Sequence, residues 1–277
     1  MDTPEGALVG TVAWVHDVLA AYRKRGVAAV ISPEDDMHND ADPTATARYF
    51  YVGLSALETI LDALLLARKT QVTRILDLPC GFGRVLRHLR AAFPDAELHA
   101  CDLYDNRIQF CGDVLGAVPV KSKEKLSDLQ LPASYDLIWC GSLLTHLPEG
   151  LFEEAFRLMC RSLAPEGVAV ITVHGRYVPL NQRTGVKYLA DELFIRAERG
   201  FYRTGFGYAD YHTPDIYTDQ SDYGISISAP SYVLRLLEDD DSISVLSYQD
   251  RAWDDHHDVV VIGKRSVNHR WSWPGSR

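Results

Sequence analysis

Two aspartates and two glycines stand at a spacing that could hold a small charged ligand. Asp77 ends an apolar run and is followed by a turn that contains Gly81 and Gly83, and Asp102 ends the next apolar run. Glycine lets a ligand approach the backbone closely, and the N-terminus of the helix that follows offers free N–H groups. This arrangement is typical of nucleoside-containing ligands at the carboxyl ends of a parallel sheet.

The ligand that these residues fit carries a ribose and a positive charge but no phosphate. A dinucleotide site has a third glycine where this chain has Leu86. The carboxylate of Asp77 would repel a pyrophosphate, whereas it suits an ammonium group. Asp102 can accept hydrogen bonds from both ribose hydroxyls. S-adenosylmethionine fits this description, and an NAD-dependent oxidoreductase is the disfavoured alternative.

The elements that must position these residues alternate between strand and helix from about residue 72 onward. Strands are expected at residues 72–78, 97–101, 117–120, 135–140 and 168–173, with helices at 85–93, 105–115 and 151–163. Such alternation predicts an α/β fold with a doubly wound, mostly parallel sheet. After a helix at 232–237, strands at 243–248 and 258–262 are so close that they should form an antiparallel hairpin. The sheet would then have seven strands.

Two further regions complete the predicted architecture. Amphipathic helices at residues 7–25 and 45–68 form an N-terminal helical cap over residues 1–70, and the core spans 71–277. An insertion rich in aromatic residues, 176–223, follows the fifth strand. It is either a lid or binding loop, or a helical unit that packs its aromatic side chains into a small core of its own.

From about residue 72 to 264 the chain resembles the class I S-adenosylmethionine-dependent methyltransferases. Four motifs carry the resemblance by their order and spacing: LDLPCGFG at 76–83, CDL at 101–103, YDLIWCGSLLTH at 135–146 and LAPEG at 163–167. The terminal hairpin is also similar to the last two strands of that family. The family commonly has glycine where this chain has Pro79, which leaves Gly81 and Gly83 to make the close approach.

The resemblance implies a set of cofactor-binding residues in the loops after the first four strands. They are Asp77, Pro79, Cys80, Gly81, Gly83, Asp102, Leu103, Ser122, Cys140, Gly141, Ser142 and Leu143. Asp77 and the glycine turn would hold the methionine part, and Asp102 the ribose. Leu103 would contact adenine. In the loop after the third strand no residue matches the family's usual acidic one, so Ser122 is the candidate for the adenine edge. Residues 140–143 would face the methionyl amine and the sulfonium.

His146 and His174 are the candidates for a general base, because each follows the carboxyl end of a core strand. A base is needed only where the acceptor must lose a proton, as a hydroxyl or a carbon acid does. His146 could instead contact the cofactor or simply pack. Tyr177 could orient an acceptor, and Tyr49 and Tyr51 could wall the acceptor pocket together with the insertion; simple packing is the alternative.

Two other polar pairs are interpreted as structural. His256 and His257 stand beside aspartates in a short hairpin link, which favours a solvated turn over a metal site. No metal site is therefore predicted. Arg84 and Arg87 begin the first core helix and are expected on its solvent face.

The composition limits the partners that this chain could have. Its 277 residues carry 28 Lys+Arg against 38 Asp+Glu, a net charge of −10, and lack the basic stripe typical of nucleic-acid readers. The longest apolar runs, such as 168–173, are far below the roughly 18 residues that span a bilayer, and the start lacks the features of a signal peptide. The five cysteines include no C-x-x-C pair, and they resemble the reduced core cysteines of cytosolic proteins. A cytoplasmic protein without nucleic-acid or membrane partners is therefore expected.

The sequence thus predicts an enzyme that transfers a methyl group from S-adenosylmethionine to a small-molecule acceptor. Hydroxyl oxygen is the preferred acceptor atom because histidines flank the site, with nitrogen and carbon as alternatives. A protein methyltransferase would need an open groove, whereas the long insertion suggests a covered pocket. A non-catalytic nucleoside-binding module is the remaining alternative. The N-terminal helices could close over the cofactor and acceptor or could form a homodimer contact.

Overall fold

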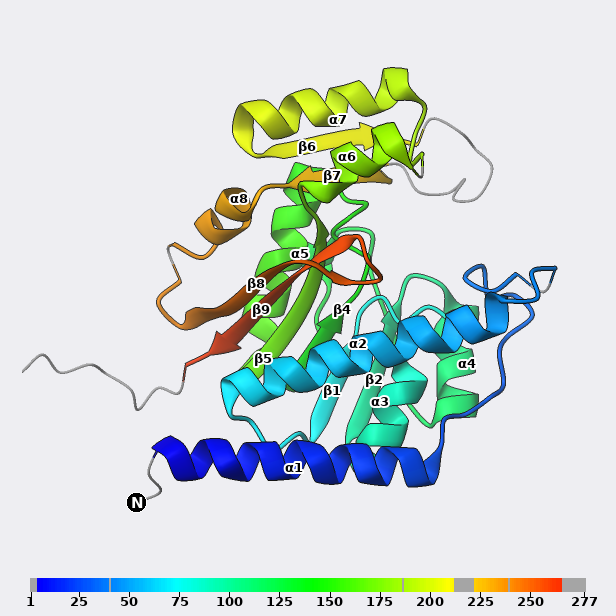
Figure 1. Ribbon diagram of the computed structural model, residues 1–277, viewed down its shortest axis with the longest axis vertical. Coiled ribbons are helices and arrows are strands. Elements are labelled where there is room, and N and C mark those ends of the chain that lie inside the picture. Colours follow the sequence, from blue (N-terminus) through cyan, green and yellow to red (C-terminus); the bar gives the residue numbers. More distant parts are fainter. Residues whose placement is uncertain (1–3, 40, 186, 212–221, 239, 266–277) are drawn as a thin grey trace, which may run out of the picture.

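The computed structural model describes residues 4–39, 41–185, 187–211, 222–238 and 240–265, and its centre is a seven-stranded sheet (Figure 1). The strand order is β3-β2-β1-β4-β5-β9-β8. The strands are β1 (Arg74–Asp77), β2 (Glu97–Asp102), β3 (Val118–Lys121), β4 (Tyr135–Cys140), β5 (Leu163–His174), β8 (Ile243–Trp253) and β9 (His257–Lys264). The first five are parallel, and β9 is antiparallel to both β5 and β8. The predicted doubly wound sheet with a terminal antiparallel hairpin is confirmed.

Helices cover both faces of this sheet, so most of its strands are buried on both sides. The helices are α1 (Pro4–Arg25), α2 (Ala45–Ala67), α3 (Leu86–Ala92), α4 (Asp105–Leu115), α5 (Glu149–Ser162) and α8 (Pro230–Arg235). Alternate residues of β4 enter different cores: Trp139 packs with α2, α3 and α4, whereas Ile138 packs with α5 and α8. This two-sided burial explains why the strands appear in the sequence as nearly continuous apolar runs.

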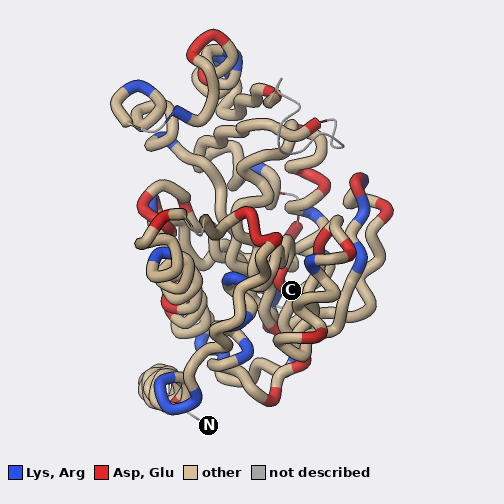
Figure 2. The backbone as a smooth tube through the Cα atoms, turned by 90° about the vertical axis from the view of Figure 1, so that its right-hand side faces the viewer, with Lys and Arg blue, Asp and Glu red and all other residues tan. Residues whose placement is uncertain are grey.

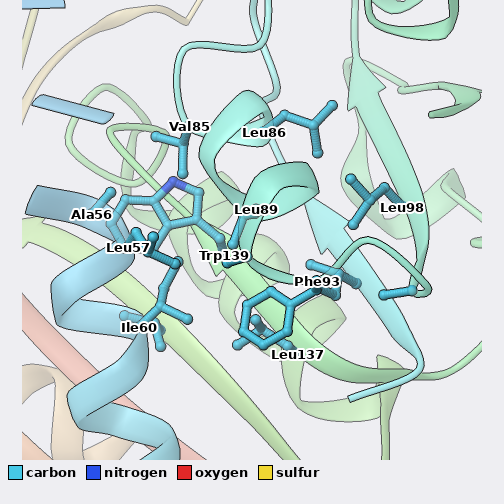
Figure 3. Packing of buried hydrophobic residues seen from close by; sticks show 14 of the residues in the cluster. Ala56, Leu57, Ile60, Val85, Leu86, Leu89, Phe93, Leu98, Leu137 and Trp139 are labelled. Carbon is cyan, nitrogen blue, oxygen red and sulfur yellow. The ribbon is translucent and has the colours of Figure 1, made fainter. Parts of the chain in front are cut away.

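The core under α2 and α3 centres on Trp139. Its indole lies among Leu57 of α2, Val85 and Leu89 (Figure 3). All four side chains are buried, and burying each aliphatic one stabilises the fold by about 1.5–3 kcal/mol. This packing fixes the carboxyl end of β4 relative to the turn between β1 and α3.

Helix α2 is more apolar than the sequence analysis recognised. It is the one described helix that is long and apolar enough to meet the criteria for crossing a membrane. Its apolar residues recur at helical spacing, and Val52, Ala56, Ile60 and Leu64 are all buried against the sheet and α3. In this fold α2 therefore packs as a core helix.

The insertion after β5 is a folded unit rather than a loop over its described length. It contains α6 (Tyr177–Thr184), α7 (Asp191–Thr204) and a two-stranded antiparallel sheet of β6 (Phe206–Asp210) and β7 (Gly224–Ser228). Residues of α6, α7 and β7 share a small separate core, and the unit lies at one end of the main sheet (Figure 1). The two strands were not predicted, and the unit extends to Ser228 rather than ending at residue 223; residues 212–221 lie outside the described residues.

Candidate functional site

A cavity of about 390 Å³ opens at the carboxyl ends of β1, β2 and β4. It is lined by ten of the twelve predicted cofactor-binding residues: Asp77, Pro79, Cys80, Gly81, Asp102, Leu103, Ser122, Gly141, Ser142 and Leu143. Gly83 and Cys140 do not line it. The strand order reverses between β1 and β4, and ligands of open α/β sheets bind at such a point.

The two glycines in the turn after β1 have different surroundings. Gly81 and Gly83 have φ of +50° and +77°, where side chains other than glycine are strained. A Cβ on Gly83 would lie 2.5 Å from Cδ1 of Leu115 on α4, whereas a Cβ on Gly81 would meet nothing within 4 Å. Gly83 therefore allows helix packing, while Gly81 leaves open space beside the cavity.

Asp77 is a buried carboxyl with an unsatisfied oxygen. It is 1% exposed, and its Oδ2 has no hydrogen-bond partner among the described residues. Burial and the nearby Asp102 raise its pKa well above the usual value, against the opposing effects of Arg84 and the Leu86 N–H. Because buried polar atoms are nearly always paired, this oxygen fits a ligand that brings a positive charge and hydrogen-bond donors.

Asp102 is held in place by the backbone around it. Its Oδ2 accepts a hydrogen bond from the Gly81 N–H (3.0 Å), and its Oδ1 accepts one from the Tyr104 N–H (3.2 Å). Burial raises the pKa of this carboxyl, although Arg107 and the backbone N–H groups oppose the shift. A carboxylate has about four acceptor positions, so Asp102 keeps acceptor capacity for a ribose hydroxyl beside these backbone hydrogen bonds.

The loop after β4 is shaped by close packing. A Cβ on Gly141 would lie 2.7 Å from Nε1 of Trp139. Ser142 has a φ of +59°, and its N–H donates to Oγ1 of Thr172 on β5 at 2.8 Å. These contacts hold the backbone of residues 141–143 at the edge of the cavity.

His146 lines the cavity and has a defined tautomer. Its Nδ1 lies 2.8 Å from the carbonyl oxygen of Gly224 on β7 and 3.3 Å from the Tyr211 hydroxyl. Because a carbonyl only accepts, Nδ1 carries the proton and the lone pair of the ring lies on Nε2. The ring stacks on Tyr223 with 4.7 Å between centroids. Burial lowers the pKa of His146 to about 4, against the opposing effect of the Gly224 hydrogen bond. The imidazole is therefore neutral at pH 7 and can accept a proton at Nε2.

His174, the other predicted base, does not line the cavity. It ends β5 and is buried, with its ring 6.2 Å from that of His146 and 5.1 Å from that of His257. His174 lies instead with His256 and His257, in a cluster of histidines beside the cavity.

The three tyrosines predicted to contact the acceptor lie outside the cavity lining. Tyr51 is 60% exposed, and Tyr177 lies under the guanidinium of Arg251. Tyr49 is buried and donates from its hydroxyl to Oδ2 of Asp35 at 2.7 Å, which places it behind a residue that does line the cavity.

Other residues from the same two regions reach the cavity instead. Residues 35–37 come from the N-terminal segment, and Tyr223 comes from the insertion, while Trp253 is contributed by the end of β8. None of these residues belongs to a motif, and their position at the cavity depends on contacts between distant parts of the chain. They could therefore not be predicted from the sequence.

The two arginines expected on a solvent face are turned inward. Arg87 is fully buried and donates to the carbonyl oxygens of Ala28 and Val30 at 2.8 Å and of Gly83 at 3.0 Å. Arg84 lines the cavity, and burial lowers its pKa. The prediction was wrong because the N-terminal segment covers this face of α3, which makes Arg87 a link between that segment and the glycine turn.

Comparison with known protein families shows that residues 75–167 match the methyltransferase domain family. Comparison with curated protein sequences finds no match. The matched segment runs from the second residue of β1 to the beginning of β5 and contains all twelve predicted cofactor-binding residues.

Several solved structures share the fold at low sequence identity. An S-adenosylmethionine-dependent methyltransferase from Clostridium acetobutylicum is 16% identical, with a TM-score of 0.50 over 79% of this chain and 92% of that one. Protein PH0226 from Pyrococcus horikoshii is 11% identical, with a TM-score of 0.52 over 83% and 95%. CalS10, an amino pentose methyltransferase from Micromonospora echinaspora whose structure contains S-adenosylmethionine, is 14% identical, with a TM-score of 0.50 over 79% and 96%. These likenesses establish the fold.

Proposed function

We propose that this chain, a class I S-adenosylmethionine-dependent methyltransferase, methylates a small-molecule acceptor at a hydroxyl oxygen. The family match over residues 75–167 and the shared fold support this enzyme class and cofactor. The acceptor class and the acceptor atom are our inference. The observation that carries it is the position of His146 at the cavity wall, with its Nδ1–H donated to the Gly224 carbonyl and its lone pair therefore on Nε2.

The cavity offers partners for the methionyl ammonium, the ribose and the methionyl carboxylate of the cofactor. The unsatisfied Oδ2 of Asp77 would accept from the methionyl ammonium, and Asp102, held by the Gly81 N–H, would bind the ribose. Arg84, which lines the same cavity, is a candidate partner for the methionyl carboxylate. Leu103 and Ser122 would then lie near adenine, and residues 141–143 near the sulfonium.

When bound, S-adenosylmethionine supplies a methyl group already activated by its positive sulfur. The chain's residues then have to align the acceptor and exclude water, and alignment contributes up to about 7–11 kcal/mol to such a reaction. Tyr223, Trp253 and Leu147 give the cavity an apolar wall that suits an acceptor with ring character.

His146 would act as the general base for a hydroxyl acceptor. Its Nε2 takes the proton that the hydroxyl loses, and the hydrogen bond from Nδ1–H to the Gly224 carbonyl stabilises the imidazolium that forms. The same hydrogen bond fixes the ring orientation.

We also propose that the enzyme works in a reducing compartment, the cytoplasm. All five cysteines are buried and free, although Sγ of Cys80 and of Cys111 are only 3.9 Å apart. Free thiols this close are typical of proteins that are kept reduced.

Replacing His146 by Gln tests the proposed base. Phenols, sugar alcohols and primary amines would be screened as acceptors by mass-spectrometric detection of S-adenosylhomocysteine. With a hydroxyl acceptor, we expect kcat of the variant to fall roughly 10²- to 10⁴-fold, while the affinity for S-adenosylhomocysteine changes little. His16→Gln, an exposed histidine on α1, is the control and should leave kcat unchanged. Turnover of amines alone, or an unchanged kcat in His146→Gln, would contradict hydroxyl methylation with this base.

A further inference from the structure

Three histidines gather where the end of β5 meets the beginning of β9. His174 and His257 are paired in register across these antiparallel strands, and His256 precedes His257 in the turn from β8. One ring nitrogen from each residue lies within 4.8 Å of the other two. The histidines of the hairpin link, expected in a solvated turn, are therefore packed against a third histidine from the core.

Two of these imidazoles have a buried nitrogen without a partner. Nδ1 of His174 and Nδ1 of His257 form no hydrogen bond with any residue that the structure describes, and the two side chains are only 3% and 4% exposed. Buried polar atoms are rarely unpaired, and each such case requires an explanation. Two such residues in one cluster of three histidines point to a shared ligand.

The third imidazole is oriented by a backbone carbonyl. Nδ1 of His256 lies 2.7 Å from the carbonyl oxygen of Asp254. Since that oxygen only accepts, Nδ1 carries the proton and Nε2 is free to bind a ligand. Histidines that bind metals usually donate their other N–H in this way, which fixes the tautomer and the ring.

We propose that His174, His256 and His257 bind a divalent transition-metal ion, Zn²⁺ in the first instance, with a water molecule in the fourth position. Three imidazoles and an open position are an established donor set for zinc, whose Zn–N distance is about 2.0–2.1 Å. A tetrahedral ion would bring the nitrogens to roughly 3.4 Å from one another, so small side-chain movements close the site. Imidazole also binds Cu²⁺ and Ni²⁺, so these ions are the comparison metals for Zn²⁺.

The protonation state of the cluster agrees with this geometry. Burial and the neighbouring imidazoles lower the pKa of both His174 and His257 well below the usual value. Neutral imidazole is the form that binds a metal.

The site adjoins the methyl-transfer cavity but is separate from it. The ring of Trp253, which lines the cavity, is 4.9 Å from that of His257. A bound ion would link the end of β5 to the terminal hairpin, and binding only to the folded state would raise thermal stability. The proposal does not depend on the identity of the acceptor.

Metal binding by the full-length chain tests this site directly. The protein is prepared without a polyhistidine tag, stripped with a chelator and titrated with Zn²⁺ by calorimetry and with Co²⁺ by visible absorption. We expect one ion per chain, a tetrahedral Co²⁺ spectrum and a higher Tm with Zn²⁺. Absence of stoichiometric binding would overturn the proposal.

Substitutions locate the ion. His256→Gln, at the half-buried position, should weaken Zn²⁺ binding by about 100-fold or more and remove the Co²⁺ spectrum while the circular dichroism spectrum stays unchanged. His16→Gln on α1 is the matched control and should bind as the wild type does. His174→Asn provides a second test from the other strand. Unchanged affinity in both His256→Gln and His174→Asn would show that the ion lies elsewhere and that the cluster is not a metal site.

Discussion

At the scale of single residues, the two aspartates of the first and fourth strands illustrate opposite uses of a carboxylate. Asp77 lies at the ligand end of β1, buried and with one oxygen unsatisfied. Asp136 lies at the other end of the sheet, where it accepts hydrogen bonds from Thr73 and Lys69. Partial burial raises the pKa of Asp136, but these hydrogen bonds outweigh it and lower the pKa to about 2. The first residue is positioned for a ligand and the second for stability.

Replacing Asp77 by Asn should therefore strengthen the fold while weakening cofactor binding. The folded-state pKa of Asp77 is raised, so its ionisation destabilises the cofactor-free protein progressively as pH rises above the unfolded value. We expect Asp77→Asn to have a higher Tm than wild type at pH 8 and a similar Tm at pH 4. Its affinity for S-adenosylmethionine should fall roughly 10- to 100-fold, as expected for the loss of a charged hydrogen-bond partner.

Asp136→Asn is the matched control for that experiment. Its lowered pKa contributes stability above the unfolded pKa, and this contribution is lost as pH falls through about 2. We expect Asp136→Asn to lower Tm at pH 8 without changing cofactor affinity. Equal effects of the two substitutions on Tm and affinity, measured by calorimetry, would contradict the roles assigned here.

At the scale of elements, the turn from β1 to α3 carries most of the site. Gly83 is required by its close packing against Leu115 of α4. Gly81 is favoured by its positive φ, and the space beside it is open to the cavity. The two glycines, two positions apart in one motif, are thus constrained by different parts of the molecule.

Alanine at each glycine separates these constraints. Gly83→Ala should destabilise the protein by about 2 kcal/mol or more, because the added methyl overpacks against Leu115 in addition to the strain of a positive φ. Gly81→Ala should cost about 1 kcal/mol, the strain alone, but should weaken S-adenosylhomocysteine binding at least tenfold because its methyl occupies space at the cavity. Denaturant unfolding and calorimetry measure both quantities. A reversed order of stability would show that the surroundings of the turn have been misassigned.

The sequence predicted the regular elements well and the irregular contacts poorly. Residues 105–115 and 135–140 match α4 and β4, because apolar periodicity and a clear turn bound each of them. Strands β6 and β7 were missed, since short strands outside the main sheet carry little pattern of their own. The inward position of Arg87 could not be predicted, because it depends on carbonyls about sixty positions away in the N-terminal segment.

At the scale of the whole molecule, the proposed cofactor-binding residues are local in sequence, whereas the rest of the cavity lining is not. The predicted cofactor residues lie in four loops at one edge of the sheet, where strand order alone brings them together. The remaining wall combines residues 35–37, Tyr223 and Trp253 from three distant regions. This difference explains why the motif residues at the cavity were found from the sequence and the rest of its wall was not.

The charge distribution agrees with a ligand that is not a polyanion. Lys and Arg are interspersed with Asp and Glu over the described part of the chain in Figure 2, and the net charge of the sequence is −10. The cavity lining contains six acidic residues (Asp35, Asp36, Asp77, Asp102, Glu124 and Asp222) and four basic ones (Arg84, Arg107, Lys123 and Lys125). A ligand with both a cationic and an anionic group suits such a mixed lining better than a polyanion does.

Titration of the full-length chain with S-adenosylhomocysteine by calorimetry, with NADH as the comparison ligand, tests the central claim most directly. We predict saturable binding of one S-adenosylhomocysteine per chain, no binding of NADH, and a roughly 10- to 100-fold loss of affinity in Asp102→Asn, which removes the charged acceptor for the ribose. Absence of heat with both S-adenosylmethionine and S-adenosylhomocysteine, or wild-type affinity in Asp102→Asn, would contradict the assignment of this cavity as the cofactor site.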